Sequence, residues 1–326
     1  MADRVLITGG AGFIGLHLIR RLLDQGCEIT ALDDFSRGKE DPEFAALAKD
    51  FRLVRHDLTR PVPDGLLDGS FDAVYHLAAV VGVQRTQSAP AHVLRTNLLT
   101  TVNLLDWCDR NPPGAVFLSS TSEVGDGAAQ LGVAPFPTPE NAPFALVEPR
   151  RPRSSYALSK VASESMLWLR QDSYKVRIAR YYNVYGPRMG HSHVIPQLIG
   201  RIADGVDPFP LYGAEQSRAF CYVDDAVRAS VGLMALPTDA PVLANIGNDT
   251  EEIRIENLAR RLFRLAGVAP ALAAQAAPPG SPERRLPDLT TLRSVLPSLE
   301  YTPLDTGLRA MLDWYGANRP DRPAVR

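Results

Sequence analysis

Short apolar runs alternate with segments of helical periodicity along the first part of the chain. The apolar runs are typical of buried strands and lie at residues 5–7, 28–32, 51–56, 71–79, 115–118 and 176–182. Helical periodicity is found at residues 16–23, 91–110 and 155–170. Strands that alternate with helices form parallel sheets, because each helix returns the chain to the same edge of the sheet. The pattern therefore predicts an α/β fold built on a doubly wound parallel sheet.

Beyond residue 183 the elements become shorter and are more often interrupted by proline and glycine. We expect helices at 195–203, 224–236, 255–266 and 304–315, and strands at 209–212 and 242–246, the second returning to the main sheet. Two segments without a pattern, 125–153 and 267–282, are expected to be loops. The sequence thus predicts a main domain of residues 1–182 with a returning segment near 218–247, and a smaller lobe of residues 183–217 and 248–326.

A glycine-rich turn at residues 8–15 joins the first predicted strand to the first predicted helix. Gly9 permits a tight turn, Gly12 lets the backbone approach a diphosphate, and Gly15 lets the helix pack closely on the strand. A diphosphate at this turn meets free N–H groups and the positive end of the helix dipole. The turn therefore predicts a dinucleotide site.

The acidic pair Asp33 and Asp34 follows the second predicted strand. An acid at the end of this strand accepts hydrogen bonds from an adenosine ribose and repels a 2′-phosphate. The sequence therefore predicts NAD rather than NADP as the cofactor. Arg37 leaves an alternative open, because an arginine can accommodate the additional phosphate.

Composition and charge narrow the range of partners. The 326 residues are 45% hydrophobic and 22% charged, which suits a chain with a large core, and the net charge of −2 provides no basic field for nucleic acid or anionic membrane. No basic and apolar leader precedes Arg4, so we expect a cytoplasmic protein. The three cysteines and six histidines lack metal-ligand spacing, His191 and His193 included, so no metal is expected.

Two clusters of residues could carry out chemistry. Tyr156 and Lys160 are four residues apart, on one face of the predicted helix. A lysine cation and a positive nicotinamide ring would favour the phenolate, which could then take a hydroxyl proton while the carbon gives hydride to NAD. Thr121, Ser122 and Glu123 follow the fifth predicted strand, at the edge where doubly wound sheets bind ligands. Taken alone, the first cluster also fits an exposed helix face and the second a turn cap.

With these motifs, the chain resembles the extended short-chain dehydrogenase/reductases, in particular the nucleotide-sugar epimerases, dehydratases and decarboxylases. The matching segments keep the expected order and span nearly the whole chain: TGGAGFIG (8–15), Asp33-Asp34, Asp57-Leu58, HLAA (76–79), SSTSEV (119–124), YALSK (156–160), YNVYGPR (182–188), SRAFCYVDD (217–225) and RRLPD (284–288). The resemblance implies a Rossmann-type domain that binds NAD and a C-terminal α/β lobe that binds a UDP- or GDP-linked sugar. It also implies a homodimer formed through the helices at 91–110 and 155–170.

The resemblance further implies three sets of site residues. The catalytic set is Tyr156, Lys160, Thr121, Ser122 and Glu123. The cofactor set is Gly9, Gly12, Phe13, Ile14, Gly15, Asp33, Asp34, Ser36, Asp57, Leu58, Leu77, Ala78, Ala79, Asn97, Ser119, Tyr156, Lys160, Tyr182 and Val184. The substrate set is Val81, Thr121, Glu123, Asn183, Val194, Phe209, Tyr212, Arg218, Arg285 and Asp288. Of the cofactor set, Asn97 could instead fill a buried polar gap.

The three reactions of this group begin alike, because Tyr156 takes the O4 proton, C4 gives hydride to NAD and a 4-keto sugar forms. Glu123 and Arg285 resemble decarboxylase residues, whereas residues 157–159 resemble the epimerases. We predict an NAD-dependent nucleotide-sugar 4-epimerase; the alternatives are a UDP-glucuronic acid decarboxylase, then a 4,6-dehydratase and, least favoured, a non-catalytic NAD-binding sensor. A tyrosine usual between the positions of Val124 and Gly125 is missing, which would enlarge the sugar pocket or shift its loop.

Overall fold

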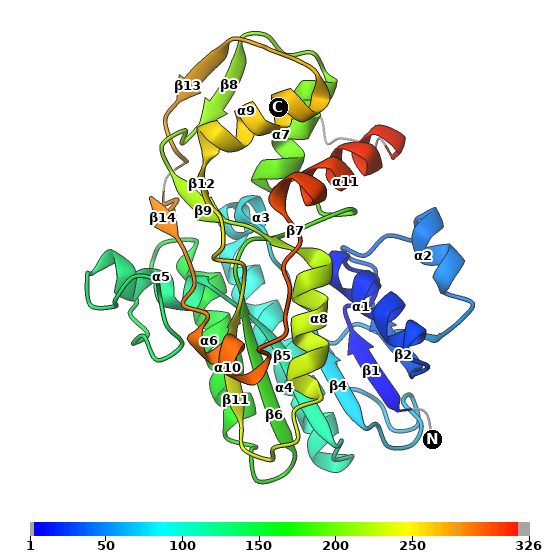
Figure 1. The fold of residues 1–326 in the computed structure, drawn as a ribbon. Coiled ribbons are helices and arrows are strands. Elements are labelled where there is room, and N and C mark those ends of the chain that lie inside the picture. The colour runs from blue at the N-terminus through cyan, green and yellow to red at the C-terminus, as the bar shows by residue number, and fades with distance from the viewer. Residues whose placement is uncertain (1–2, 279, 319–326) are drawn as a thin grey trace.

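A parallel sheet of seven strands forms the centre of the molecule (Figure 1). The computed structural model describes residues 3–278 and 280–318; the last eight residues of the expected second lobe lie outside this part. The strand order is β11-β6-β5-β4-β1-β2-β3, and every neighbouring pair is parallel. The strands are β1 (Arg4–Thr8), β2 (Glu28–Asp33), β3 (Arg52–Arg55), β4 (Ala73–His76), β5 (Ala115–Thr121), β6 (Lys175–Tyr181) and β11 (Val242–Ile246). This is the Rossmann-type doubly wound sheet that the sequence predicts, with the switch in strand order at β1.

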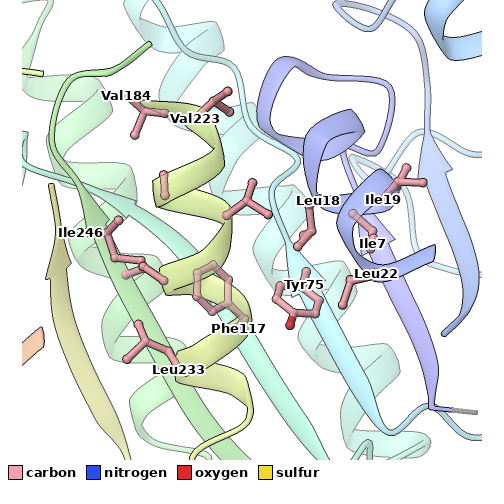
Figure 2. Close-up of a cluster of buried hydrophobic side chains, with 14 of the residues drawn as sticks. Ile7, Leu18, Ile19, Leu22, Tyr75, Phe117, Val184, Val223, Leu233 and Ile246 are labelled. Atoms are coloured by element: carbon pink, nitrogen blue, oxygen red, sulfur yellow. The ribbon is translucent and has the colours of Figure 1, made fainter. Parts of the chain in front are cut away.

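Helices cover both faces of this sheet, because successive strand residues point to opposite sides. Val5 and Ile7 of β1 pack with α1 (Phe13–Asp24) and α8 (Val223–Met234), where Figure 2 shows Leu18, Leu22 and Leu233 beside the rings of Tyr75 and Phe117. Leu6 of β1 belongs to the opposite core, which contains residues of α4 (Pro90–Arg110) and α6 (Ser154–Trp168). All three β1 residues are buried, as expected for a strand covered on both faces.

A second lobe with its own hydrophobic core stands above the carboxyl edge of the sheet (Figure 1). Its helices are α7 (Val194–Ala203), α9 (Ile255–Ala266) and α11 (Leu304–Ala317). Its strands are β8 (Phe209–Tyr212) with β13 (Leu272–Gln275), and β12 (Glu252–Arg254) with β9 (Ser217–Ala219) and β14 (Arg284–Arg285). The strands β7 (Val184–Tyr185) and β10 (Cys221–Tyr222) pair where the chain passes between the two parts. Because the second lobe has its own core, we propose that the main domain and the second lobe have the limits predicted from the sequence.

The expected loop at 125–153 contains a helix at its start, α5 (Glu123–Gln130). Gly125 and Gly127 hide the helical pattern, and the packing explains why they are present. A Cβ at residue 127 would lie 1.7 Å from the carbonyl oxygen of Ala145, and one at residue 125 would lie 2.9 Å from Cγ2 of Thr138. The expected loop at 267–282 contains β13. Among the described residues, the short helices α2 (Pro42–Leu47), α3 (Val83–Ser88), α5 and α10 (Thr290–Val295) were not predicted.

We expect Gly15→Ala to lower the free energy of unfolding by about 1–3 kcal/mol, because an added Cβ overpacks the turn between β1 and α1. That Cβ would lie 2.3 Å from the carbonyl oxygen of Gly9, a backbone atom that cannot move aside alone. Gly316→Ala is the matched control, since Gly316 lies in α11 with no atom within 4 Å of the added Cβ. Urea denaturation of both variants measures the effect, and equal stabilities would contradict the packing argument.

Candidate active site

A cleft of about 1030 Å³ runs along the carboxyl edge of the sheet and is lined by residues of both lobes. Its volume exceeds the usual range for one small ligand, roughly 300–1000 Å³. The cofactor-set residues that line it are Gly9, Gly12, Phe13, Ile14, Gly15, Asp33, Asp34, Ser36, Leu58, Leu77, Ala78, Ala79, Ser119, Tyr156, Lys160 and Val184. The cleft therefore brings together most of the residues that the sequence assigns to the cofactor.

The glycine-rich turn has the form that a bound diphosphate requires. Gly9 has φ 74°, and a Cβ there would lie 2.8 Å from the nitrogen of Ala78. Beside Gly12, the only atom within 4 Å of an added Cβ is the Gly9 oxygen at 3.0 Å, so a side chain would fill space that belongs to the cleft. These residues fit a dinucleotide whose diphosphate lies at the N-terminus of α1.

Asp33 ends β2 and lines the same part of the cleft. Its carboxylate accepts hydrogen bonds from the N–H of Ala11 at 2.9 Å and of Phe35 at 2.8 Å. Burial raises the pKa of Asp33, and these two N–H groups oppose the effect. Asp33 thus joins the glycine-rich turn to the loop after β2, and it lies where an adenosine ribose is expected.

Three members of the cofactor set do not line the cleft. Asp57 accepts hydrogen bonds from the backbone N–H and hydroxyl of Thr59. Asn97 is buried and bonds both backbone groups of Val80, so it fills a polar gap behind the cleft wall. Tyr182 is buried, and its N–H donates to the carbonyl of Ile246. The side chains of Asp57 and Asn97 are thus engaged by protein groups, and the assignment of all three residues to the cofactor stays a prediction.

The catalytic set meets where β5 ends and α6 passes. Lys160 is buried and donates from Nζ to the carbonyl oxygen of Ser119 at 2.7 Å. Burial lowers the pKa of Lys160 to about 8, against the opposing charge of Glu164. The Thr121 hydroxyl hydrogen bonds the phenol of Tyr156, and Ser122 and Glu123 complete the cleft wall. The predicted catalytic residues therefore lie together.

The protein's own groups favour the protonated form of Tyr156. Burial raises the pKa of its phenol, and the charge of Glu123 raises it further. The bond from Thr121 and the charges of Arg37 and Arg285 act in the opposite direction but do not reverse the shift. The expectation that a lysine neighbour would lower this pKa is not met by the protein groups alone, because burial dominates. The positive nicotinamide ring of bound NAD is the other group expected to lower the pKa of Tyr156.

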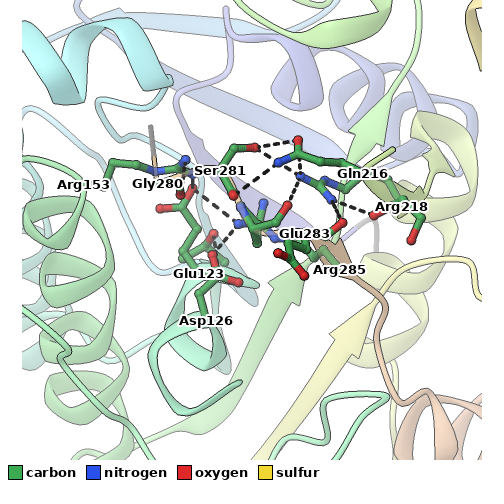
Figure 3. Close-up of polar contacts among 12 residues, drawn as sticks. Glu123, Asp126, Arg153, Gln216, Arg218, Gly280, Ser281, Glu283 and Arg285 are labelled. Atoms are coloured by element: carbon green, nitrogen blue, oxygen red, sulfur yellow. Dashed lines mark hydrogen bonds and ion pairs between the residues drawn. The ribbon is translucent and has the colours of Figure 1, made fainter. Parts of the chain in front are cut away.

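Charged side chains of alternating sign meet between α5 and the second lobe, where Figure 3 shows Glu123, Asp126 and Arg285 close together. Glu123 accepts a hydrogen bond from Arg153 at 3.2 Å and lies 4.0 Å from Arg285, which is also paired with Asp126. Arg153 and Asp126 were not predicted. Their spacing was the available signal, because Asp126 lies three residues after Glu123 on one helix face and Arg153 three residues before Tyr156.

The substrate set is divided by the structure. Val81, Thr121, Glu123, Asn183, Val194 and Arg285 line the cleft. Phe209 is fully buried against Phe263, and Tyr212 lies at the surface under the guanidinium of Arg201. Neither ring therefore lines the cleft that was expected to hold the nucleotide base.

Arg218 and Asp288, the other two members of the substrate set, also lie outside the cleft lining. Arg218 donates to the carbonyls of Ser217, Pro282 and Glu283, as Figure 3 shows in part. Asp288 accepts a hydrogen bond from the N–H of Thr290. Both side chains bond to neighbouring protein groups, and their assignment to the substrate stays a prediction.

Comparison with known proteins agrees with this geometry. The model of the NAD dependent epimerase/dehydratase family matches residues 5–247. The chain belongs to this family. UDP-glucuronic acid decarboxylase 1 of Xenopus tropicalis is 34% identical over 321 residues, covering 96% of this chain and 72% of that protein. UDP-N-acetyl-alpha-D-glucosaminuronate decarboxylase of Bacillus cytotoxicus is 29% identical over 325 residues, covering 97% and 98%.

Two solved structures of similar fold contain related ligands. UDP-glucose 4-epimerase of Thermotoga maritima with UDP-glucose has a TM-score of 0.82 at 25% identity, covering 96% of this chain and 99% of that one. MoeE5 in complex with UDP-glucuronic acid and NAD has a TM-score of 0.81 at 27% identity, with the same coverage. The predicted family, fold and NAD cofactor are thus confirmed, and the chain is an NAD-dependent enzyme of the epimerase/dehydratase family.

Two absences hold for residues 3–278 and 280–318. Within these residues no three His, Cys, Asp or Glu side chains form a group that could hold a metal ion. Among the helices of the same part of the chain, none is both long and apolar enough to cross a membrane.

We expect Lys160→Met to raise the melting temperature at pH 7 and to abolish activity. The folded pKa of Lys160, about 8, lies below its ordinary value of 10.5, so folding carries a penalty that is complete below pH 8. The penalty disappears as the pH rises from about 8 to 10.5, because the folded state has already released the proton of Lys160 while the unfolded state still holds it. At about 1.4 kcal/mol per pKa unit it amounts to at most about 3.5 kcal/mol.

The gain in melting temperature should therefore be largest at pH 7 and should shrink towards pH 10. Lys175→Met is the control, because the side chain of Lys175 is 42% exposed. Calorimetry across this range measures the difference between the variants. A lower melting temperature for Lys160→Met at every pH would show that the bond to Ser119 outweighs the burial penalty.

Proposed function

We propose that the chain is an NAD-dependent decarboxylase of a UDP-linked uronic acid, the alternative reading of the sequence. Decarboxylases from Xenopus and Bacillus align with almost the whole chain, which supports this choice over the 4-epimerase first predicted. The same comparison supports the substrate class, since both relatives are named for UDP-linked uronic acids. A GDP-linked sugar has no comparable support.

The observation that carries the proposal is the position of Glu123 between Arg153 and Arg285, beside Tyr156. Although burial opposes it, the carboxylates of Asp126 and Glu123 raise the pKa of Arg285. Its charged guanidinium can pair with a uronate carboxylate, for which arginine has matching fork geometry. A neutral hexose, the substrate of a simple 4-epimerase, makes no use of two guanidinium groups at this position.

The first half of the reaction belongs to the residues at the end of β5 and on α6. When bound, NAD accepts hydride from the sugar C4 and later returns it. Tyr156 takes the O4 proton, and Thr121, bonded to its phenol, holds it in place. The Lys160 cation favours the phenolate of Tyr156 electrostatically. The hydrogen bond from Lys160 to Ser119 fixes the lysine beside β5. The product of this half is a 4-keto sugar.

The second half uses the charged residues. In the 4-keto uronate the carboxylate lies on C5, next to the ketone, so the electrons of the C5–C6 bond can move into the ketone as carbon dioxide leaves. A carboxylate held by Arg285 also lies near the charge of Glu123, and its loss as a neutral molecule relieves that repulsion. A proton then returns to C5, and hydride and proton return to C4 and O4.

A 4-epimerase remains the second candidate because of the segment between Tyr156 and Lys160. Its residues, Ala157, Leu158 and Ser159, resemble the epimerases and lack the acidic, glycine-containing pattern usual in decarboxylases. The solved 4-epimerase of Thermotoga maritima has the same fold. In that reaction the 4-keto sugar turns and takes hydride on its other face, so no carbon is lost.

We also propose that the chain forms a homodimer through α4 and α6, which pack side by side on one face of the sheet. Apolar side chains of α6 and its end remain exposed, with Leu158 at 36%, Trp168 at 37% and Leu169 at 81%. A second copy would cover such a surface. The cytoplasm is the proposed location.

The reaction itself is tested by incubating the purified protein with NAD and UDP-glucuronic acid. We expect a product that has lost the mass of one carbon dioxide, identified by mass spectrometry and NMR. UDP-glucose is the matched substrate without a carboxylate and should not lose mass. An isomer of unchanged mass from either substrate would favour the epimerase, and loss of one water a dehydratase.

Tyr156→Phe should reduce turnover by about 10²–10⁴-fold, because the base that takes the O4 proton is removed. NAD should stay bound, as measured by the absorbance of cofactor retained after gel filtration. Tyr174→Phe serves as the control, since Tyr174 does not line the cleft. Turnover close to that of the unchanged protein would contradict the assignment of Tyr156.

Glu123→Gln separates the two candidate reactions. In a decarboxylase the substitution should lower the rate of carbon dioxide release by at least about tenfold, because the repulsive charge is lost. Glu148→Gln is the matched control at an exposed position. Full activity of Glu123→Gln would argue against any role for this carboxylate. It would then favour simple epimerisation.

A further inference from the structure

Arg188 links the two loops that form the cofactor end of the cleft. It follows β7, has φ 70° and is only 5% exposed at its side chain. Its Nη1 donates to the carbonyl oxygens of Ala11 at 3.0 Å and Gly12 at 3.1 Å, both in the glycine-rich turn. Its Nη2 donates to the carbonyl of Lys39 at 2.8 Å, and its Nε to Asp41 at 2.6 Å. One guanidinium thus holds four acceptors on two separate loops.

Arg188 and Asp33 both hold Ala11 of the glycine-rich turn. The carboxylate of Asp33 accepts from the N–H of Ala11, while Arg188 donates to the carbonyl of the same residue. A trans peptide points its C=O and N–H in opposite directions. The hold on the Gly12 carbonyl therefore fixes the N–H of Phe13, an amide at the start of α1 with no acceptor inside the helix.

The loop after β2 is fixed in the same way. Asp41 pairs with Arg188 through one oxygen and caps α2 through the other, which accepts from the N–H of Phe44 at 2.9 Å. Trp314 of α11 adds a hydrogen bond to Glu43 of α2. The residues that would surround an adenosine diphosphate are therefore held in part by groups beyond the main domain.

We propose that Arg188 is a positioning residue for the cofactor, which sets the affinity for the adenosine diphosphate half of NAD by fixing the glycine-rich turn and the loop after β2. Arginine is required because its planar guanidinium reaches several acceptors in different directions. A lysine supplies the charge from a single nitrogen and cannot hold both loops.

The chain contains a matched control for a purely structural arginine. Arg177 is fully buried and donates to the carbonyls of Val176, Leu233, Leu236, Thr238 and Ala240. It therefore engages five carbonyls, where Arg188 engages three carbonyls and one carboxylate, and it does so away from the cleft. Its substitution should affect folding and leave ligand affinity unchanged.

The test compares Arg188→Met, Arg188→Lys, Asp41→Asn and Arg177→Met by titration calorimetry with NAD, ADP-ribose and UDP, together with melting temperatures. Arg188→Met should weaken NAD and ADP-ribose in parallel, by about tenfold or more, while UDP binding changes less than about twofold. Arg188→Lys should recover part of this loss, and Asp41→Asn should weaken NAD less than Arg188→Met does. Arg177→Met should lower the melting temperature with all affinities kept.

An unchanged affinity of Arg188→Met for NAD and ADP-ribose overturns the proposal, as does an equal loss for UDP. If Arg188→Met does not fold, Arg188→Lys and Asp41→Asn decide, and unchanged NAD affinity in both overturns it. The choice of UDP as a probe rests on the proposed function. Failure of the unchanged protein to bind UDP therefore counts against that function alone. The NAD and ADP-ribose results then still decide the role of Arg188.

Discussion

Burial of the parallel sheet on both faces is the constraint on which the remaining structure depends. β1 illustrates it, since Val5 and Ile7 face one helical layer and Leu6 faces the other. With both faces closed, the turns at the carboxyl edge are where residues distant in sequence can meet around a ligand. The glycine-rich turn after β1, Asp33 at the end of β2 and Thr121 at the end of β5 therefore share one cleft.

The sequence predicts what depends on local pattern and loses what depends on long-range pairing. Buried strands such as β1 follow from short apolar runs, long helices such as α4 from periodicity, and the cofactor turn from its glycines. The helix α5 was missed because its glycines are required by contacts with Thr138 and Ala145, and a local sequence pattern does not reveal such contacts. Phe209 and Tyr212 look alike in sequence, yet neither reaches the cleft, because register within the second lobe places one in the core and the other at the surface.

The site also shows how opposing charges are kept close in a partly buried place. Glu123, Asp126, Arg153 and Arg285 form two acidic and two basic groups whose contacts alternate in sign. Such compensation lets carboxylates remain next to Tyr156 without the cost of isolated buried charge. The same arrangement makes the environment of Tyr156 sensitive to any ligand that brings a charge of its own.

The tight packing of α5 has a consequence for how this enzyme can change. Where Gly127 meets Ala145, α5 and the 131–152 segment pack main chain against main chain, with no room for even a methyl group. A point substitution at Gly127 therefore cannot adjust this contact gradually, as it can where side chains meet. Because Glu123 and Asp126 stand on the same helix, the contact also limits how far their carboxylates can shift relative to Arg285.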